Sequence, residues 1–260
     1  MKMIGCFFAA AFLWGCTAEK AVVKIGDEVL TQKEIAFRNR LIRYQNPKEE
    51  RELGLSQLLK AYHYAAILKK IGYPVTPAQI KAEKERIDQK TLMPDRLAAI
   101  KGLFKGDEAS YLRVFVLPTL VERVLYYDIF LKDEKIQHLA FQSARDLIQE
   151  LQSPKSSWKK SLSQRGLASV SLRVGGDELS KTDPTPSAGP TITEIISKSA
   201  PMKVGEVFPA PIDAGERLLV VIFRGKSKVK SGGDLVDVVV FPKLNFSEWL
   251  GGFPRGEQYL

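Results

Sequence analysis

The hydrophobic pattern near the start of the chain predicts two short strands and then a helix. Between residues 22 and 30, the apolar runs VVKI and VL flank Gly26-Asp27, which is typical of a tight turn. Thr31 and Glu34 then form the pattern of a capping box, in which the threonine hydroxyl and the glutamate carboxylate each accept a hydrogen bond from a backbone N–H at a helix start. We therefore expect a β-hairpin that leads directly into an amphipathic helix.

The next two tracts predict helices with a clear boundary between them. Over residues 49–71, apolar side chains recur near the 3.6-residue repeat of an α-helix, and the sequence GYP at residues 72–74 ends the pattern. Thr76 and Pro77 predict a new helix start, because threonine is a good N-cap and the first helical position tolerates proline. The helix that follows, to about residue 90, is rich in charge, so we expect it to be largely solvated.

A third helical tract is predicted from Asp107 to about Leu131. Asp107 is a suitable N-cap, and Pro118 predicts a kink because proline removes one helical hydrogen bond. The tract carries several large apolar residues, among them Tyr111 and Phe115. Residues at this spacing either pack in a core or line a groove, and the pattern favours the core.

The pattern of elements changes in the second half of the chain. Residues 135–141 (KIQHLAF) fit a short strand, residues 143–151 fit a helix, and residues 219–223 fit a buried strand. Residues 235–241 predict one more apolar strand, followed by a short helix that contains Trp249.

These elements predict an α+β fold, and 260 residues are enough to bury a substantial core. We expect a leader at residues 1–16, a mainly helical domain at residues 17–132 and a small α+β domain at residues 133–228. Residues 229–260 are expected to return to the helical domain and complete it.

The leader has the pattern of a bacterial lipoprotein signal peptide. The positive start MKM precedes an apolar run, residues 4–14, that is shorter than the roughly 20 residues of a permanent membrane helix. The run ends in LWGC, which resembles a lipobox, with Trp14 where a small residue is usual. We expect cleavage before Cys16 and lipidation of its thiol. Cys6, the other cysteine, would leave with the leader, so the mature chain is expected to form no disulfide and no metal–thiolate site.

Composition and charge narrow the possible partners. The formal net charge is +9 at pH 7, but basic residues form no arginine-rich run and do not alternate with aromatic ones, so nucleic acid is not expected as a partner. We expect a solvated basic surface, with attraction to anionic lipids, cell-wall polymers or acidic proteins as the alternative. The chain has no phosphate-binding loop, no HExxH motif and no thiol pair in its mature part, so no cofactor and no metal are expected.

The opening pattern resembles the chaperone domain of SurA/PrsA-like periplasmic foldases, which begins V-x-V-N-G-x-x-I-T-x-x-E-L. Here it reads VVKIGDEVLTQKEI, with Ile25 and Asp27 around the glycine. The stretch GYPVTPAQI at residues 72–80 is similar to the G-x-x-V-T-x-x-E-I of the family. The resemblance implies a helical domain that binds unfolded proteins without ATP. Thr17 after the lipidated cysteine favours the outer membrane, on its periplasmic face, in a host that has two membranes.

The second domain resembles a parvulin-type peptidyl-prolyl isomerase domain. The similar segments are GGD at residues 175–177, KVGEV at residues 203–207 and the strand at residues 219–223, in that order. These are scaffold positions, so the resemblance implies the fold more strongly than the activity.

The residues that the resemblance assigns to catalysis are mostly replaced. His138 is the one candidate for the first of two paired histidines, and Arg217 stands in the place of the second. Thr191 and Ile195 occupy the places of the pocket methionine and phenylalanine. Because arginine stays protonated at physiological pH, it cannot act as a neutral imidazole partner. His63 lies in a predicted helix with no evident partner, so we expect isomerase activity to be lost.

The combined expectation is a lipid-anchored envelope chaperone that binds unfolded or nascent exported proteins. The candidate client-contacting residues are Phe115, Tyr111 and Trp249, although each also fits a core position. Two alternatives stay open: an active parvulin-type isomerase that uses His138, and an adaptor lipoprotein dedicated to one envelope complex.

Overall fold

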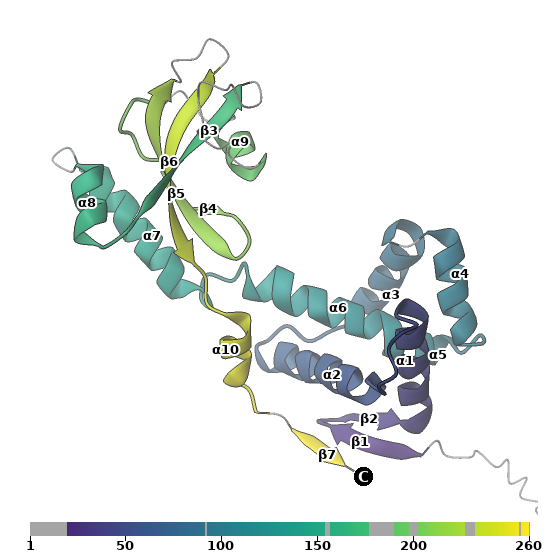
Figure 1. Ribbon diagram of the computed structural model, residues 1–260. Helices are drawn as coiled ribbons and strands as arrows, with labels where there is room; N and C mark the ends of the chain where they lie inside the picture. The colour runs from purple at the N-terminus through teal and green to yellow at the C-terminus, as the bar shows by residue number, and fades with distance from the viewer. Residues whose placement is uncertain are drawn as a thin grey trace, which may run out of the picture. The chain divides into compact units, whose positions relative to one another are not determined.

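The computed structural model describes residues 20–91, 93–153, 157–176, 190–197, 202–226, 232–254 and 256–259. They form an α+β fold, as the sequence predicts (Figure 1). The chain divides into two compact units: unit 1 is Met1–Glu122 with Arg255–Leu260, and unit 2 is Arg123–Pro254. The division therefore falls after Glu122 and not after residue 132. The predicted lipobox with Cys16, and Asp177 of the GGD turn, lie outside the described residues.

Unit 1 begins with the predicted hairpin. Strands β1 (Ala21–Ile25) and β2 (Glu28–Thr31) pair antiparallel, with Gly26 at φ 59° in the turn, a backbone conformation that glycine adopts without strain. The C-terminal strand β7 (Glu257–Tyr259) pairs antiparallel with the other edge of β1, so the sheet order is β2-β1-β7. The two ends of the described chain therefore meet in one small sheet.

The capping box predicted at Thr31 is present at the start of helix α1 (Gln32–Gln45). The Glu34 N–H donates to the Thr31 hydroxyl at 3.3 Å, and the Thr31 N–H donates to the Glu34 carboxylate at 2.9 Å. Ile35 and Leu41 on the apolar face of the helix are buried. The local sequence thus fixes where the strand ends and the helix begins.

The helix expected over residues 49–71 begins only at Gly54, whereas the next two helix starts lie where the sequence predicts. Thr76 caps its helix with a second capping box, in which Gln79 is the partner, and Pro77 occupies the first turn. Asp107 caps the third tract by accepting a hydrogen bond from the Ser110 N–H at 3.0 Å. The elements are α2 (Gly54–Lys70), α3 (Pro77–Arg86), η1 (Ile87–Thr91), α4 (Pro94–Leu103), α5 (Glu108–Tyr111), η2 (Leu112–Val116), α6 (Leu117–Arg123) and η3 (Val124–Phe130).

Pro118 sits in the middle of the third tract, where η2 and η3 are π-helical turns on either side of α6. Proline has no N–H to donate to the carbonyl of Val114, four residues earlier. That carbonyl instead accepts a hydrogen bond from Arg38 on α1 at 3.0 Å. The missing backbone bond of the proline is thus replaced by a bond that joins α1 to the third tract.

Unit 2 contains a four-stranded antiparallel sheet in the order β3-β6-β5-β4. In Figure 1 helices α7 and α8 lie on one side of this sheet and α9 on the other. The elements are α7 (His138–Leu151), α8 (Trp158–Gln164), β3 (Ser169–Gly176), α9 (Pro190–Ser197), β4 (Ile212–Asp213), β5 (Arg217–Lys226), β6 (Gly232–Pro242) and α10 (Phe246–Gly251).

The two faces of this sheet bury different clusters of side chains. On one face, α7 and α8 contribute Ala144, Leu147, Ile148 and Leu162 to a cluster with Leu218, Val220 and Val239. On the other face, α9 contributes Ile192 and Ile196 to a cluster with Val221, Val236 and Val238. Because successive strand residues point to opposite faces, this double coverage explains the uninterrupted apolar runs at residues 218–223 of β5 and 238–241 of β6.

The strand predicted at residues 135–141 is wrong. The helix α7 already begins at His138, and Ala140, Ala144 and Ile148 recur on its buried side at helical spacing. The short run KIQHL has no alternation that would favour a strand over this longer helical repeat.

The predicted return of residues 229–260 to the helical domain is correct only for the last residues. Strand β6 lies between β3 and β5 in unit 2, because Val236 and Val239 bury opposite faces and require a central position in a covered sheet. Helix α10 also belongs to unit 2. Only β7 joins unit 1.

Removal of residues 255–260 is expected to destabilise unit 1 and leave unit 2 unchanged. The deletion removes a ladder of three residue pairs with β1, and each hydrogen bond lost contributes about 0.5–1.5 kcal/mol. We expect unit 1 to lose about 1–3 kcal/mol of unfolding free energy. Urea unfolding followed by far-UV circular dichroism, which reports the helices of both units, should then show an earlier first transition.

Tryptophan fluorescence supplies the internal control, because Trp158 and Trp249 both lie in unit 2. The unfolding transition that their fluorescence reports should keep its urea midpoint in the deletion variant. Tyr259→Ser is the matched variant: the side chain is exposed and the backbone ladder is kept, so we expect a change within about 0.5 kcal/mol. Unchanged circular dichroism in the deletion variant would rule out a stabilising role for β7.

Candidate functional site

The residues that the sequence assigned to an isomerase site are not gathered in one place. His138 is the first residue of α7 and is exposed, and Arg217 is the first residue of β5 and is also exposed. Ile195 on α9 packs half-buried against the cluster on the other face of the sheet. His63 lies on α2 in unit 1. The two histidines therefore lie in different units.

Two of the three predicted client-contacting residues lie in the core of unit 1. Phe115 is 8% exposed and Tyr111 is 3% exposed, and their rings pack against each other with centroids 5.6 Å apart. Tyr111 also meets Phe104 edge-on at 5.4 Å. These positions stabilise unit 1, and we do not assign them to a client-binding surface.

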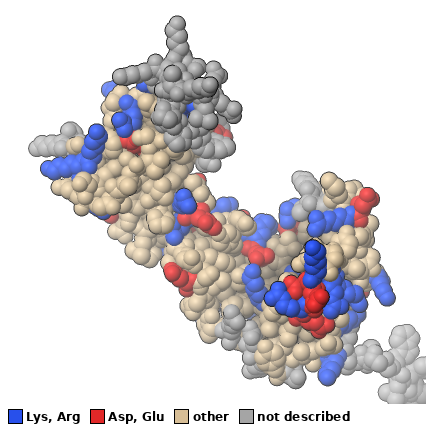
Figure 2. Space-filling model, in the orientation of Figure 1, with Lys and Arg blue, Asp and Glu red and all other residues tan. Residues whose placement is uncertain are grey.

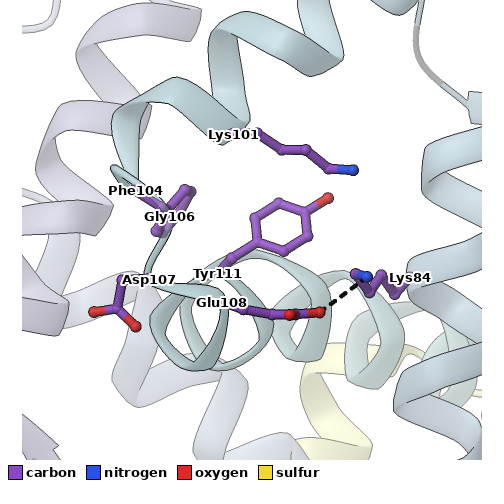
Figure 3. Close-up of a pocket in the computed structure, with 7 residues that line it drawn as sticks. All are labelled: Lys84, Lys101, Phe104, Gly106, Asp107, Glu108 and Tyr111. Atoms are coloured by element: carbon purple, nitrogen blue, oxygen red, sulfur yellow. Dashed lines mark ion pairs between the residues drawn. The ribbon is translucent and has the colours of Figure 1, made fainter.

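Tyr111 nevertheless forms the floor of a pocket of about 250 Å³ in unit 1 (Figure 3). Figure 3 shows the Lys84, Lys101 and Glu108 side chains around its ring. The residues that line the pocket are Lys84, Lys101, Phe104, Gly106, Asp107, Glu108 and Tyr111.

The charges of this pocket are neutralised within unit 1. Lys84 pairs with Glu108 at 2.9 Å, and Lys101 pairs with Asp88 at 2.7 Å. The Tyr111 hydroxyl donates to Asp88 at 3.2 Å, and burial raises the pKa of this hydroxyl. Both lysines and Asp107, which pairs with Lys33 at 2.7 Å, are therefore already engaged within unit 1.

Unit 2 contains a second hollow of about 300 Å³, which we call the aromatic groove. Its walls come from η3, from the turn between β4 and β5, and from the segment that joins β6 to α10. The residues that line it are Tyr126, Phe130, Leu131, Glu216, Arg217, Pro242, Lys243, Leu244, Asn245, Phe246 and Ser247.

Two buried polar side chains hold the walls of the aromatic groove together. The Gln137 amide donates to the Phe130 carbonyl at 2.9 Å and accepts from the Leu244 N–H at 2.7 Å. The Lys243 ammonium is buried, donates to the Leu131 carbonyl and pairs with Asp213 at 2.8 Å. Because the bonds of Leu244 to Gln137 and of Lys243 to Leu131 and Asp213 join segments that are distant in sequence, the groove is a fixed feature of unit 2.

The aromatic rings beside the groove form a continuous cluster. Phe130 lies 4.9 Å from Phe246 and 5.2 Å from Trp249, and Trp249 lies 5.0 Å from Phe253, measured between ring centroids. Tyr126 meets Phe246 edge-on at 4.8 Å. Trp249 is half-buried, so it is an anchor of α10 that also keeps part of its surface open to solvent.

The rim of the groove combines exposed apolar and charged side chains. Leu244, which lines the groove, is 42% exposed. Tyr127 does not line it, but its ring lies 4.8 Å from that of Tyr126, which does, and it is 56% exposed. The Tyr126 hydroxyl donates to Glu216, and this hydrogen bond raises the pKa of Tyr126 to about 12. The tyrosine therefore stays neutral at any physiological pH and contributes an uncharged aromatic surface.

On the face shown in Figure 2, the described lysine and arginine side chains lie in several separate groups, and many of these groups adjoin acidic residues. Within the described residues no group of three or more histidine, cysteine, aspartate or glutamate side chains could hold a metal ion. No described helix has the length and apolar character needed to cross a bilayer.

Comparison with known proteins identifies no relative. No family model, no curated protein and no solved structure matches this chain. The resemblance to SurA/PrsA-like foldases therefore rests on the residues that carry it and stays a prediction.

The pocket of unit 1 generates a prediction about pH. The hydrogen bond from Lys33, at 2.7 Å, and the N-cap bond from Ser110 lower the pKa of Asp107 to about 2. A lowered pKa stabilises the fold above the unfolded value of about 4, and this contribution is lost as the pH falls toward about 2. Asp107→Asn keeps a good N-cap but cannot pair with Lys33 as a charge. Its stability difference from wild type should therefore shrink between pH 4 and pH 2.

Urea unfolding at pH 5, 4, 3 and 2 measures this difference. Asp95→Asn is the matched control, because Asp95 is exposed and no described cation pairs with it. A difference between wild type and Asp107→Asn that stays constant down to pH 2 would contradict the assignment.

Proposed function

We propose that this protein is a lipid-anchored, ATP-independent chaperone of the bacterial envelope that holds apolar segments of unfolded exported proteins at the aromatic groove. The observation that carries the proposal is the groove itself. Its fixed aromatic wall adjoins two exposed apolar side chains, those of Tyr127 and Leu244. Large apolar side chains left exposed beside a cavity are typical of an interaction surface.

The chemistry of the groove suits transient holding. Aromatic rings offer a large contact area with few rotatable bonds, so they bind varied apolar segments at a small entropic cost. Glu216 and Arg217 at the rim can contact the polar backbone of an extended segment. Such binding needs no nucleotide, because affinity comes from removing apolar surface from water.

The sequence supports the same function independently. The opening pattern VVKIGDEVLTQKEI resembles the chaperone domain of SurA/PrsA-like foldases, and the resemblance implies that a segment after the second domain returns to the first. The pairing of β7 with β1 is consistent with that implied connection. The lipobox-like LWGC motif supports a membrane anchor at Cys16, on the periplasmic side.

We further propose that isomerase activity is lost. His138 is exposed at a helix start and Arg217 is exposed at the groove, so neither is enclosed in an apolar pocket. An isomerase must favour the twisted amide over the planar one, which requires such a preorganised pocket.

Suppression of client aggregation tests the groove. The double variant Tyr127→Ser/Leu244→Ser removes exposed apolar side chains at the rim, and we expect it to lose most of the protection that wild type gives at a near-stoichiometric ratio. The matched control is Tyr73→Ser/Met93→Ser, which removes two exposed apolar side chains of unit 1, 47% and 80% exposed. Light scattering of a chemically unfolded client measures protection.

Equal protection by both variants would contradict the use of the groove. The same preparations should give no rate above background on an X-Pro peptide, and His138→Ala should change nothing. A rate enhancement that disappears in His138→Ala would make the protein an isomerase instead.

The anchor generates a separate prediction. Cys16→Ser should prevent lipidation, so the protein is expected to leave the membrane fraction or to keep its leader. Radioactive fatty-acid labelling measures this directly, with Cys6→Ser as the matched control that keeps the lipobox-like motif. Labelling of Cys16→Ser to the wild-type level would disprove the anchor.

A further inference from the structure

An arginine is buried in unit 2 without a hydrogen-bond partner. Arg173, on β3, is only 1% exposed. None of its three guanidinium nitrogens has a hydrogen-bond partner among the residues that the structure describes. Arginine stays protonated in proteins, and an unpaired buried charge is strongly unfavourable. Such a group requires an explanation, of which a bound anion is a standard one.

The neighbours of Arg173 can be identified from the strand register. Leu172 and Val174 pack against the cluster under α9, so Arg173 and Ser171 point to the face that α7 and α8 cover. On this face Asp237 lies opposite Ser171 on the neighbouring strand β6. Arg224 on β5 reaches the same place.

The single carboxylate of this group is already engaged. Asp237 accepts from the Ser171 hydroxyl at 2.6 Å and from Arg224 at 3.1 and 3.0 Å. Arg224 also lies over the Trp158 ring, 5.6 Å from its centroid, which fixes its position. Asp237 is thus paired with Arg224 and not with Arg173, and the described side chains leave the charge of Arg173 without a partner.

We infer that Arg173 forms, beside Arg224, a binding site for a small oxyanion. The planar fork of a guanidinium matches two oxygens of a phosphate or carboxylate group, whereas a spherical ion such as chloride can use only one direction at a time. Because Arg173 is almost fully buried, the ligand is a small free anion. A lipid headgroup in a bilayer or the side of a macromolecule does not reach this position.

The inference does not rest on the proposed chaperone function. The groove and Arg173 are formed by different residues of unit 2, so either assignment can fail without the other.

Thermal unfolding of the full chain in millimolar inorganic phosphate tests the site, with potassium chloride used to hold ionic strength constant. A ligand that binds only the folded state raises the unfolding midpoint in a saturable way. We expect this rise in wild type and in Arg145→Met, the matched control, because Arg145 is exposed on α7 and pairs with Glu134. We expect its loss in Arg173→Met.

Arg173→Lys keeps the charge and removes the fork, so it should bind phosphate at least tenfold more weakly. This variant and direct calorimetric titration of wild type keep the test decisive if Arg173→Met does not fold. The absence of saturable phosphate binding by wild type would overturn the inference. Retention of the full effect in Arg173→Met would overturn it as well.

Discussion

Unit 1 depends on the hydrogen bonds that the buried Glu34 carboxylate accepts. It accepts the N–H of Thr31 at the start of α1, and it also accepts a hydrogen bond from Arg113 on η2. Arg113 extends the connection to Glu28 at 2.8 Å and to the Val29 carbonyl at 2.9 Å, both on β2. A buried carboxylate is costly unless it is paired and hydrogen-bonded, so this arrangement specifies how hairpin, first helix and third tract come together.

Unit 2 depends on a different kind of constraint. Its sheet is covered on both faces, and the chain after β6 must then leave the sheet through a crowded corner. Gln137 and the buried Lys243 satisfy the backbone groups exposed at that corner. The same bonds hold Phe246 near Phe130 and so create the aromatic wall. The hydrogen bonds that satisfy these buried polar groups therefore also position the aromatic surface that we assign to client binding.

Local features of the fold could be predicted from the sequence, whereas long-range pairing could not. The capping boxes at Thr31 and Thr76 depend on residues three positions apart, so the sequence contains all the information that places them. The sequence predicts that strand β6 joins the helical domain, whereas it lies in the sheet of unit 2. Its apolar pattern fits any covered sheet, so the pattern alone does not identify its partners. The start of helix α7 is not predicted correctly, because a short apolar run fits both the two-residue repeat of a strand and the 3.6-residue repeat of a helix.

The candidate site was largely hidden for the same reason. Tyr126 and Phe246 are 120 positions apart, and nothing in either segment alone indicates that they share a wall. The repeated aromatic residues at positions 126, 127 and 130 and at 246, 249 and 253 were the available signal. The sequence pattern marks only Trp249 of these residues as a candidate, together with Tyr111 and Phe115, which have the same residue character but lie in the core. Burial, which decides between these outcomes, is a property of the assembled units.

Photo-crosslinking to an unfolded client is the most direct measurement of the central claim. A photoreactive phenylalanine analogue at Tyr127 lies at the rim of the aromatic groove, and the same analogue at Tyr73 lies on an exposed part of unit 1. The account predicts saturable crosslinks from position 127 to apolar segments of the client, and few from position 73. Equal crosslinking at the two positions, or crosslinking at position 73 alone, would contradict it.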